Sequence, residues 1–359
     1  MHPDEKNIQS VKSYKILLPI IIGLAVAAFL FYREYHPGMF SSIVINRQVI
    51  VYVLLAFLMM VLRDFGYMLR IKILAGGQYN WKNAFQVIML WEFTSAITPS
   101  AVGGTSVAVL YVHKEGIRLG KSTAIVLATS FLDELYFILF FPMVFLVITP
   151  DRLFGLHSAA ISFSSEYFYF AVTGYLIKLL YILLVFYGLF INPSVLRRIL
   201  TGIFRLKFLK KWQLQAEKVG SDIVTSSGIL KREKPAFWLG AFLATVISWS
   251  ARYLVVNFLL LALYAAIEPD KILSISDHIL LFARQLAMWI MLLVMPSPGG
   301  SGFAEAIFSD FLSDFIPVGF VSILAFSWRV ITYYPYLIIG SVLFPSWLNK
   351  HFVKKEKND

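Results

Sequence analysis

The sequence has 359 residues, of which 58% are hydrophobic and 15% charged, with a mean hydropathy of +0.73 and a formal net charge of +11. This composition excludes a water-soluble protein and indicates an integral membrane protein. The length allows roughly six to ten membrane segments of about 20 residues each and leaves no room for a sizeable soluble domain. The absence of cysteine excludes disulfides, thioether-bound haem and thiolate metal sites.

Apolar runs cover residues 16–32, 48–69, 84–112, 122–149, 168–190, 237–264, 278–315 and 318–344. The first run follows three lysines, as in a signal peptide, but it lacks a cleavage site of small residues, so we expect an uncleaved helix. Apart from 84–112 and 278–315, the runs are continuous and are predicted to cross the membrane.

Two runs are interrupted near their centres. Residues 84–112 contain ITPSAVGG, and residues 278–315 contain MPSPGG. Proline removes a backbone donor and clashes with the preceding turn, and glycine costs about 1 kcal/mol relative to alanine. Each half holds at most roughly 15 to 18 apolar residues, which is short for a crossing. We therefore predict an all-α polytopic membrane protein with about six full crossings and two re-entrant helical hairpins, 84–112 and 278–315.

The basic residues orient this arrangement, because Lys and Arg favour cytoplasmic loops. Segments 1–15, 63–82, 113–121 and 192–235 and the tail after residue 345 hold roughly 24 of the 32 Lys and Arg residues. Both termini are therefore predicted to be cytoplasmic, with the protein in the cell membrane and the two hairpins entering from opposite sides. The chain is interpreted as one membrane domain, 1–359, with a first half (15–190), a basic cytoplasmic loop (191–235) and a second half (236–345).

The two interruptions share a pattern. Pro99-Ser100 precedes Gly103-Gly104, and Pro296-Ser297 precedes Gly299-Gly300. Inverted repeats whose broken helices meet near the midplane are typical of secondary transporters, where they enclose the binding site.

Three stretches, PSAVGGTSVAVLYVHKEG, SFLDEL and PSPGGSGFAE, resemble the lysylphosphatidylglycerol synthase transmembrane family, also called flippase-like membrane proteins. The resemblance extends over residues 15–345 and implies a polytopic inner-membrane protein related to a domain that translocates aminoacylated phosphatidylglycerol. Thr105 stands where the family pattern often has an acid, and Thr129-Ser130 where it often has a Glu-Arg pair. No soluble aminoacyl-transfer domain follows in this sequence, so we expect that the protein does not make the lipid itself.

Ionisable residues inside a membrane cost about 2.5 to 3.5 kcal/mol each on insertion scales, so they face partners or a water-filled cavity. The candidate acids lie in the first half and the arginines in the second, which indicates a cavity for an anionic phosphate headgroup, with or without a cationic substituent. The alternative is structural ion pairing between helices, which we favour for Lys178. The candidate substrate-binding residues are Glu92, Pro99, Gly103, Gly104, Asp133, Glu134, Arg252, Arg284, Pro296, Pro298, Gly299, Gly300, Glu305 and Arg329.

Glu305 lies within about one turn of the helix that restarts after Gly302, where a carboxylate complements the helix dipole. It either caps that helix or tunes charge and carries a coupled proton beside a headgroup held by free backbone N–H groups.

The remaining signals indicate lipid surfaces rather than cofactors. Residues 195–212 combine apolar spacing with six basic residues and predict an interfacial helix on anionic cytoplasmic lipid. GIRLGKST is one residue short of a nucleotide-binding loop, and the histidines form no metalloprotease motif, so no cofactor or metal is expected. The positive charge has the same membrane explanation and implies no nucleic acid.

The sequence thus predicts a lipid flippase or transporter, not an enzyme, that moves a phospholipid or lipid-linked headgroup by alternating access. One alternative is an intramembrane enzyme that uses Asp133, Glu134 or Glu305 as general acid or base. The other is a non-transporting partner of a separate lipid-modifying enzyme.

Overall fold

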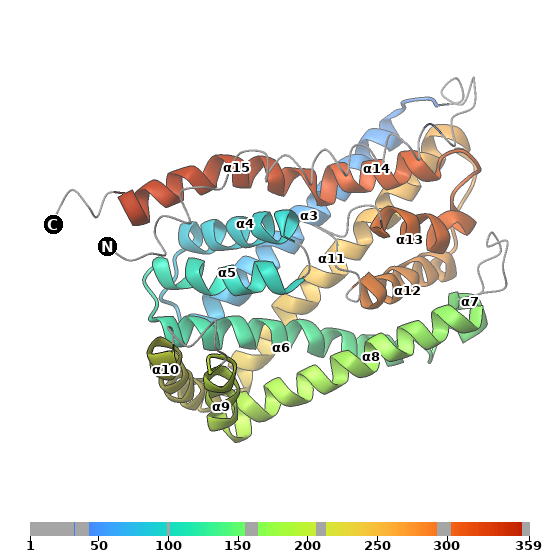
Figure 1. The fold of residues 1–359 in the computed structure, drawn as a ribbon. Helices are drawn as coiled ribbons and strands as arrows, with labels where there is room; N and C mark the ends of the chain where they lie inside the picture. The colour runs from blue at the N-terminus through green and yellow to red at the C-terminus, as the bar shows by residue number, and fades with distance from the viewer. Residues whose placement is uncertain are drawn as a thin grey trace.

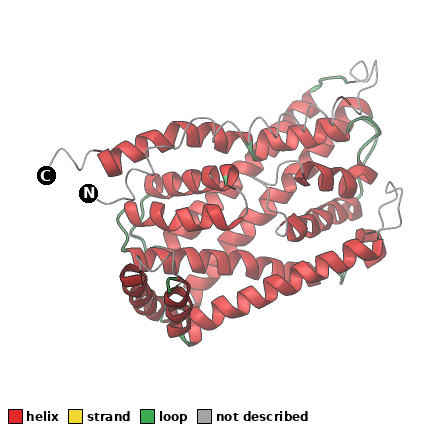
Figure 2. Ribbon diagram, in the orientation of Figure 1, coloured by secondary structure: helices red, strands yellow, loops and turns green. Residues whose placement is uncertain are grey.

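The structure, a computed structural model, describes residues 32, 43–98, 101–154, 164–205, 213–292 and 303–353. Within these residues the regular elements are all helical (Figure 2). They are α3 (Arg47–Leu74), α4 (Trp81–Ile97), α5 (Ala101–Lys114), α6 (Leu119–Val144), α7 (Pro150–Phe154), α8 (Ser164–Phe186), η2 (Tyr187–Ile191), α9 (Pro193–Ile203), α10 (Gln213–Lys231), α11 (Pro235–Ile267), α12 (Ile275–Leu292), α13 (Phe303–Leu312), η4 (Ser313–Phe315), α14 (Val321–Thr332), α15 (Tyr334–Leu348) and η5 (Asn349–Val353).

Five of the described helical segments are long and apolar enough to cross a membrane. They are Arg47–Leu74, Leu119–Val144, Phe168–Ile191, Pro235–Ile267 and Val321–His351. These helices coincide with five of the six predicted crossing segments, and the all-α polytopic membrane fold is confirmed. The sixth predicted segment, 16–32, lies outside the described residues apart from Tyr32.

Helices α3 and α11 form an antiparallel pair that runs through the middle of the molecule (Figure 1). At one end, the Asn46 amide that caps α3 donates to the Ala265 carbonyl near the end of α11 at 2.7 Å. Further along, Gly66 lies so close to α11 that a Cβ would stand 2.8 Å from the Ala244 carbonyl oxygen and would overlap Ser248. Small residues allow such an approach between membrane helices, where lipid offers no hydrophobic driving force.

The first interrupted run is a broken helix, as predicted, because α4 ends at Ile97, Thr98 is extended and α5 begins at Ala101. The MPSPGG interruption of the second run lies outside the described residues, between α12 and α13. Helices α4 and α5 have 17 and 14 residues, and α12 and α13 have 18 and 10. At 1.5 Å per residue three of the four are shorter than about 27 Å, and α13 is only about 15 Å long. In Figure 1, α4 and α5 lie side by side in the left half of the molecule and α12 and α13 in the right half, and each pair ends toward the middle. Their re-entry into a membrane from opposite sides stays a prediction.

The first hairpin is closely packed. Gly104 of α5 faces α4 so closely that a Cβ would overlap Ser95. The Thr94 and Tyr111 hydroxyls share a hydrogen bond of 2.6 Å across the hairpin. The Tyr79 hydroxyl donates to the Val112 carbonyl at 2.6 Å. These contacts hold α4 and α5 as one unit.

Three predicted boundaries are wrong. Residues 63–82 are not a loop, because α3 continues to Leu74 and ends where Gly76 and Gly77 adopt positive φ angles of 66° and 75°. The run 318–344 divides at Tyr333, which has a non-helical backbone, into α14 and α15. The interfacial helix predicted over 195–212 ends at Ile203 as α9, and α10, a mostly polar helix packed on α6 and α9, was not predicted.

Glu115, in the loop after α5, joins the first hairpin to the end of the chain. Its carboxylate accepts hydrogen bonds from Asn83 at 2.8 Å, from the Trp347 indole at 3.1 Å and from Lys350 at 3.2 Å. His351 Nε2 lies 2.9 Å from the same carboxylate. The movement of α4 and α5 is therefore restrained by the last turns of α15 and by η5.

We expect the Gly66→Ala substitution to destabilise the protein by about 1 to 3 kcal/mol, because the added methyl must displace α11 backbone. Gly202 in α9 provides the control, since a Cβ there meets nothing within 4 Å. Gly202→Ala should be neutral or stabilise by up to about 1 kcal/mol. Thermal unfolding in detergent measures both, and equal effects of the two substitutions would contradict the close α3–α11 contact.

The pH dependence of stability tests the Glu115 contacts. Burial raises the pKa of Glu115, but hydrogen bonds from His351 and Lys350 outweigh it and hold the pKa below the ordinary 4.5. A depressed carboxyl pKa stabilises the fold above the unfolded value and loses this effect as the pH falls through the folded value. The difference in Tm between the parental protein and Glu115→Gln should therefore be largest above about pH 5 and shrink on acidification. Glu268→Gln, at an exposed residue, should show no such trend.

Candidate functional site

A cluster of ion pairs lies between α3, α4, α6, α8 and α11. Arg63 and Arg70 stand seven residues apart on α3, which places them on one face of the helix. Arg63 is fully buried and contacts Asp64 at 2.8 Å and Glu92 of α4 at 2.6 Å. The Arg63 guanidinium therefore forms ion pairs with two carboxylates.

Arg70 forms a two-pronged pair with Asp133 of α6, with nitrogen–oxygen distances of 2.5 and 3.2 Å. The Trp249 indole of α11 donates to the same carboxylate at 2.7 Å. The Thr245 hydroxyl accepts a hydrogen bond from Arg70 at 3.1 Å. Charge-assisted bonds of this kind are roughly twice as strong as neutral ones, so they fix α3, α6 and α11 relative to one another.

A third pair joins α6 to α8. Lys178 donates to Glu134 at 2.6 Å and lies over the Phe137 ring, 4.4 Å from its centroid. Lys178 is buried to the same degree as the arginines of α3. The structural interpretation favoured for this lysine agrees with this contact.

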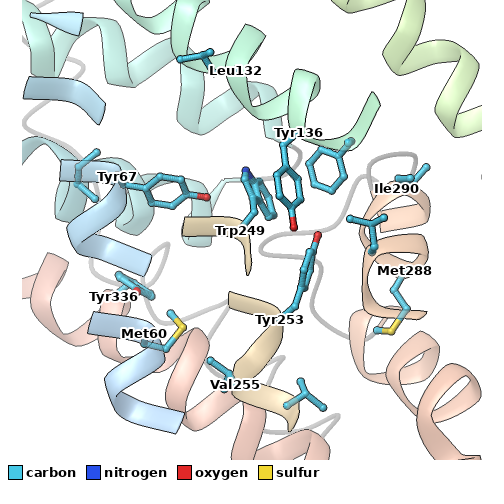
Figure 3. Packing of buried hydrophobic residues seen from close by; sticks show 14 of the residues in the cluster. Met60, Tyr67, Leu132, Tyr136, Trp249, Tyr253, Val255, Met288, Ile290 and Tyr336 are labelled. Carbon is cyan, nitrogen blue, oxygen red and sulfur yellow. The ribbon is translucent and has the colours of Figure 1, made fainter. Parts of the chain in front are cut away.

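Tyrosine and tryptophan side chains contact the ion pairs. Figure 3 shows the Tyr67, Trp249 and Tyr336 rings among the buried hydrophobic residues. The Tyr67 ring lies between the two arginines of α3, with its centroid 4.6 Å from the Arg63 guanidinium and 4.8 Å from that of Arg70. The Tyr336 hydroxyl of α15 donates to Asp64 at 2.9 Å. In Figure 3 the hydroxyls of Tyr136 and Tyr253 point into the same space beside Trp249.

Arg252 of α11 differs from the other cations of the cluster. Its guanidinium lies over Trp289, 4.4 Å from the ring centroid, and 5.3 Å from that of Trp249. It is half-buried, and no described carboxylate forms an ion pair with it. Arg252 is therefore an intramembrane cation without a direct counter-charge among the described residues.

A small pocket adjoins Arg252 between α11, α12, α13 and α14. Its volume is about 20 Å³, the room of roughly one water molecule. It is lined by Arg252, Tyr253, Val256, Gln285, Met288, Trp289, Phe308 and Trp328. The Tyr253 hydroxyl is buried and has no hydrogen-bond partner within the described residues. The Arg252 guanidinium and the Tyr253 hydroxyl are thus both able to donate hydrogen bonds at this pocket.

The structure brings together four of the predicted site residues, Glu92, Asp133, Glu134 and Arg252. Arg284 lies elsewhere, where it donates to Asp314 and to the Phe311 carbonyl, both at 2.8 Å, and to the Arg152 carbonyl at 3.1 Å. Arg284 is therefore paired with Asp314, whereas Glu92 and Asp133 are each held by an arginine of α3.

The other predicted residues fall into two groups. Gly103 and Gly104 lie in α5, and Arg329 lies in α14 with its guanidinium 5.0 Å from the Tyr333 ring centroid. Glu305 belongs to α13, but its side chain is outside the described part of the structure. Pro99, Pro296, Pro298, Gly299 and Gly300 lie outside the described residues.

The predicted segregation of charge between the halves is also wrong. Arg63 and Arg70 supply cations in the first half, where Lys178 was the one intramembrane cation expected. The signal for the two arginines was RDFGYMLR, in which Arg63 and Arg70 are separated by two helical turns within an apolar context. Because that stretch was predicted to be a loop, the arginines that neutralise Glu92 and Asp133 were not identified from the sequence.

Apolar helices arranged around an internal network of charges define a polytopic integral membrane protein. The match to known families is more specific: residues 16–340 fit the family described as "Lysylphosphatidylglycerol synthase TM region", and the chain belongs to that family. It is 29% identical over 356 residues to a "UPF0104 membrane protein" of Archaeoglobus fulgidus, covering 95% of this chain and 99% of that protein. No solved structure matches the chain.

A double-mutant cycle tests the Arg284 contacts. Arg284→Gln leaves Asp314 without its cation, and breaking a buried pair costs about 3 to 5 kcal/mol. We expect the lower end of that range, because the Asp314 side chain keeps 20% of its exposure. Adding Asp314→Asn should recover part of the lost Tm, whereas adding Glu92→Gln should not. Recovery with Glu92→Gln alone would contradict the pairing.

Proposed function

We propose that this protein moves a lipid with an anionic headgroup across the cell membrane by alternating access, and that Arg252 binds the headgroup phosphate. The observation that carries this proposal is the half-buried Arg252 guanidinium, which stacks on Trp289 and has no carboxylate partner among the described residues. An unpaired charge inside a membrane costs several kcal/mol unless it faces water or a ligand. The planar guanidinium donates two hydrogen bonds to a phosphate at once.

The surroundings of Arg252 support a ligand site. Tyr253 adds a hydroxyl without a partner in the described structure, and Gln285 adds an amide at the same pocket. Met288, Trp289 and Phe308 supply apolar walls. A few polar groups in a mostly apolar pocket are the usual composition of a small-molecule site.

The size of the pocket supports alternating access. A volume of about 20 Å³ cannot hold a phosphate headgroup, so binding requires that the helices around the pocket separate. The pocket lies where α12 and α13 face α11, and α4 and α5 approach the cluster from the other end (Figure 1). We infer that the two hairpins re-enter the membrane from opposite sides and form the two gates, as broken helices do in transporters.

The distribution of basic residues supports the orientation. Arg63 and Arg70 are counted here as intramembrane residues. The remaining basic residues of the proposed cytoplasmic segments still include those around α9 and α10 and Lys350 near the end of the chain. Both termini are proposed to be cytoplasmic, because short basic loops stay on that side. In α9 the two arginines Arg197 and Arg198 face an anionic leaflet in this orientation.

The other residues of the predicted site have supporting roles in this proposal. Glu92, Asp133 and Glu134 are held by buried cations, so they shape the cavity around Arg252. Gly103, Gly299 and Gly300 are proposed to let the headgroup approach the hairpin backbones, and Glu305 and Arg329 to lie at the second gate. Gly104 packs against Ser95 and instead holds α5 against α4. These roles remain predictions.

The test is transport of fluorescently labelled phosphatidylglycerol in vesicles that contain the purified protein. Arg252→Gln should slow the transbilayer movement by about 10- to 100-fold, because a charged hydrogen bond contributes about 1.5 to 3 kcal/mol. Lys271→Gln, which removes an exposed cation, is the matched control and should transport at the parental rate. Equal thermal unfolding of both variants would show that the fold is kept.

Three outcomes would contradict the proposal. Transport by Arg252→Gln at the parental rate would remove Arg252 from the site. Chemical turnover of the headgroup by purified protein in detergent would favour the intramembrane enzyme. An absence of both transport and turnover in the parental protein would favour a non-transporting partner of a lipid-modifying enzyme.

A further inference from the structure

The charges of the central cluster are balanced as a group but not pair by pair. Its cations are Arg63, Arg70, Lys178 and Arg252, and its carboxylates are Asp64, Glu92, Asp133 and Glu134. Four positive and four negative charges give a net charge of zero. Two pairs, Arg70–Asp133 and Lys178–Glu134, are complete in themselves.

The imbalance is confined to the other two cations. Arg63 contacts both Asp64 and Glu92, while Arg252 contacts neither. The second carboxylate of the Asp64–Glu92 pair is therefore balanced across space by Arg252, whose guanidinium lies 5.3 Å from the centroid of the Trp249 ring that donates to Asp133 in the same cluster. In a low-dielectric interior that longer-range interaction is weakly screened and remains significant.

An anion bound to Arg252 removes this balance. The cluster then carries a net charge of −1. The excess negative charge lies in the group of Arg63, Asp64 and Glu92, which has two carboxylates and one cation. Two carboxylates that share one site cannot both stay ionised without compensation, and binding a proton is the usual remedy. The proton adds to a carboxylate oxygen and restores the net charge to zero.

We propose that the Asp64–Glu92 pair takes up one proton when an anionic lipid headgroup binds at Arg252, so that headgroup and proton move together. This inference rests on the proposed function and adds the coupling ion to it. The geometry gives the proton access, because the Asp64 and Glu92 side chains each keep 21% of their exposure while Arg63 between them has none.

The groups that face the pair come from four helices. They are Arg63, Tyr67 and Arg70 on α3, Asp133 on α6, Arg252 on α11 and Tyr336 on α15. The Tyr336 hydroxyl donates a hydrogen bond to Asp64 and contributes no net charge. Arg70 and Asp133 neutralise each other at 2.5 Å. The positive charge of Arg252 thus balances the Asp64–Glu92 pair, and an anionic ligand at the pocket can neutralise that charge.

Proton uptake during binding provides the test. Dihexanoyl phosphatidylglycerol is added to the purified full-length protein in weakly buffered detergent, and a pH indicator reports protons while tryptophan fluorescence reports binding. We expect about one proton per bound probe, and a Kd that rises about tenfold per pH unit in the alkaline range. Glycerol 3-phosphate, which carries the phosphate without acyl chains, forms the second arm and should bind more weakly. As a monoester with a second pKa of about 6, it carries up to two negative charges, so above that pH it should take up about two protons where the lipid takes up one.

Variants separate the coupling from the site. Asp64→Asn or Glu92→Gln leaves Arg63 with one carboxylate, so each should fold, and each should bind the probe without proton uptake and without the alkaline rise in Kd. Glu268→Gln, at the exposed pair with Lys271, is the charge-matched control and should keep the proton ratio.

The outcomes distinguish two kinds of failure. Binding of the probe by the parental protein without proton uptake overturns the coupling and leaves Arg252 as the headgroup site. Absence of probe binding by the parental protein, or binding unchanged in Arg252→Gln, overturns the site and the coupling with it. Tighter binding of glycerol 3-phosphate than of the lipid would assign the site to a water-soluble phosphate and contradict the lipid.

Discussion

Arg63 is fully buried between Asp64 and Glu92, and this three-charge contact sets the arrangement of the helices around it. A guanidinium inside a membrane must be neutralised, and removal of one partner from a buried pair costs far more than an exposed pair contributes. Because Glu92 lies on α4 and Asp64 also accepts from Tyr336 of α15, the contact joins the first hairpin to a helix near the end of the chain. Segments that are hundreds of residues apart in the sequence therefore meet at one buried charge.

Close helix packing makes this contact possible. A Cβ on Gly66 would overlap Ser248 of α11, and a Cβ on Gly340 of α15 would overlap Phe93 of α4. The Ser248 hydroxyl donates to the Arg63 carbonyl at 3.0 Å, so the glycine contact and the charged contact share the same turn of α3. Lipid supplies no hydrophobic driving force between helices, and close packing together with polar bonds has to hold them instead. The central network therefore both stabilises the fold and defines the interior surface.

The interior surface is asymmetric in a way that bears on transport. The cations Arg63 and Lys178 are buried, whereas their carboxylate partners Glu92 and Glu134 keep 21% and 15% of their side-chain exposure. The carboxylates are thus more accessible than the cations that hold them. In the proposed transport, a phosphate that approaches Arg252 would meet this negative charge, which would weaken its binding and favour its release on the other side.

The sequence by itself determined that the protein lies in a membrane, that it is helical, where five long apolar helices lie, and that the run 84–112 is interrupted. Composition, run length and the chemistry of proline and glycine act locally, so those features are encoded within about 30 residues of chain. It also identified Glu92, Asp133, Glu134 and Arg252 as intramembrane charges. The partners of these charges were decided only by the tertiary structure, because Arg70 meets Asp133 across 63 residues of sequence. Hydropathy assigns an arginine its full cost of desolvation and ends the apolar run at Leu69, before Arg70, whereas a carboxylate from another helix offsets that cost and lets α3 continue to Leu74.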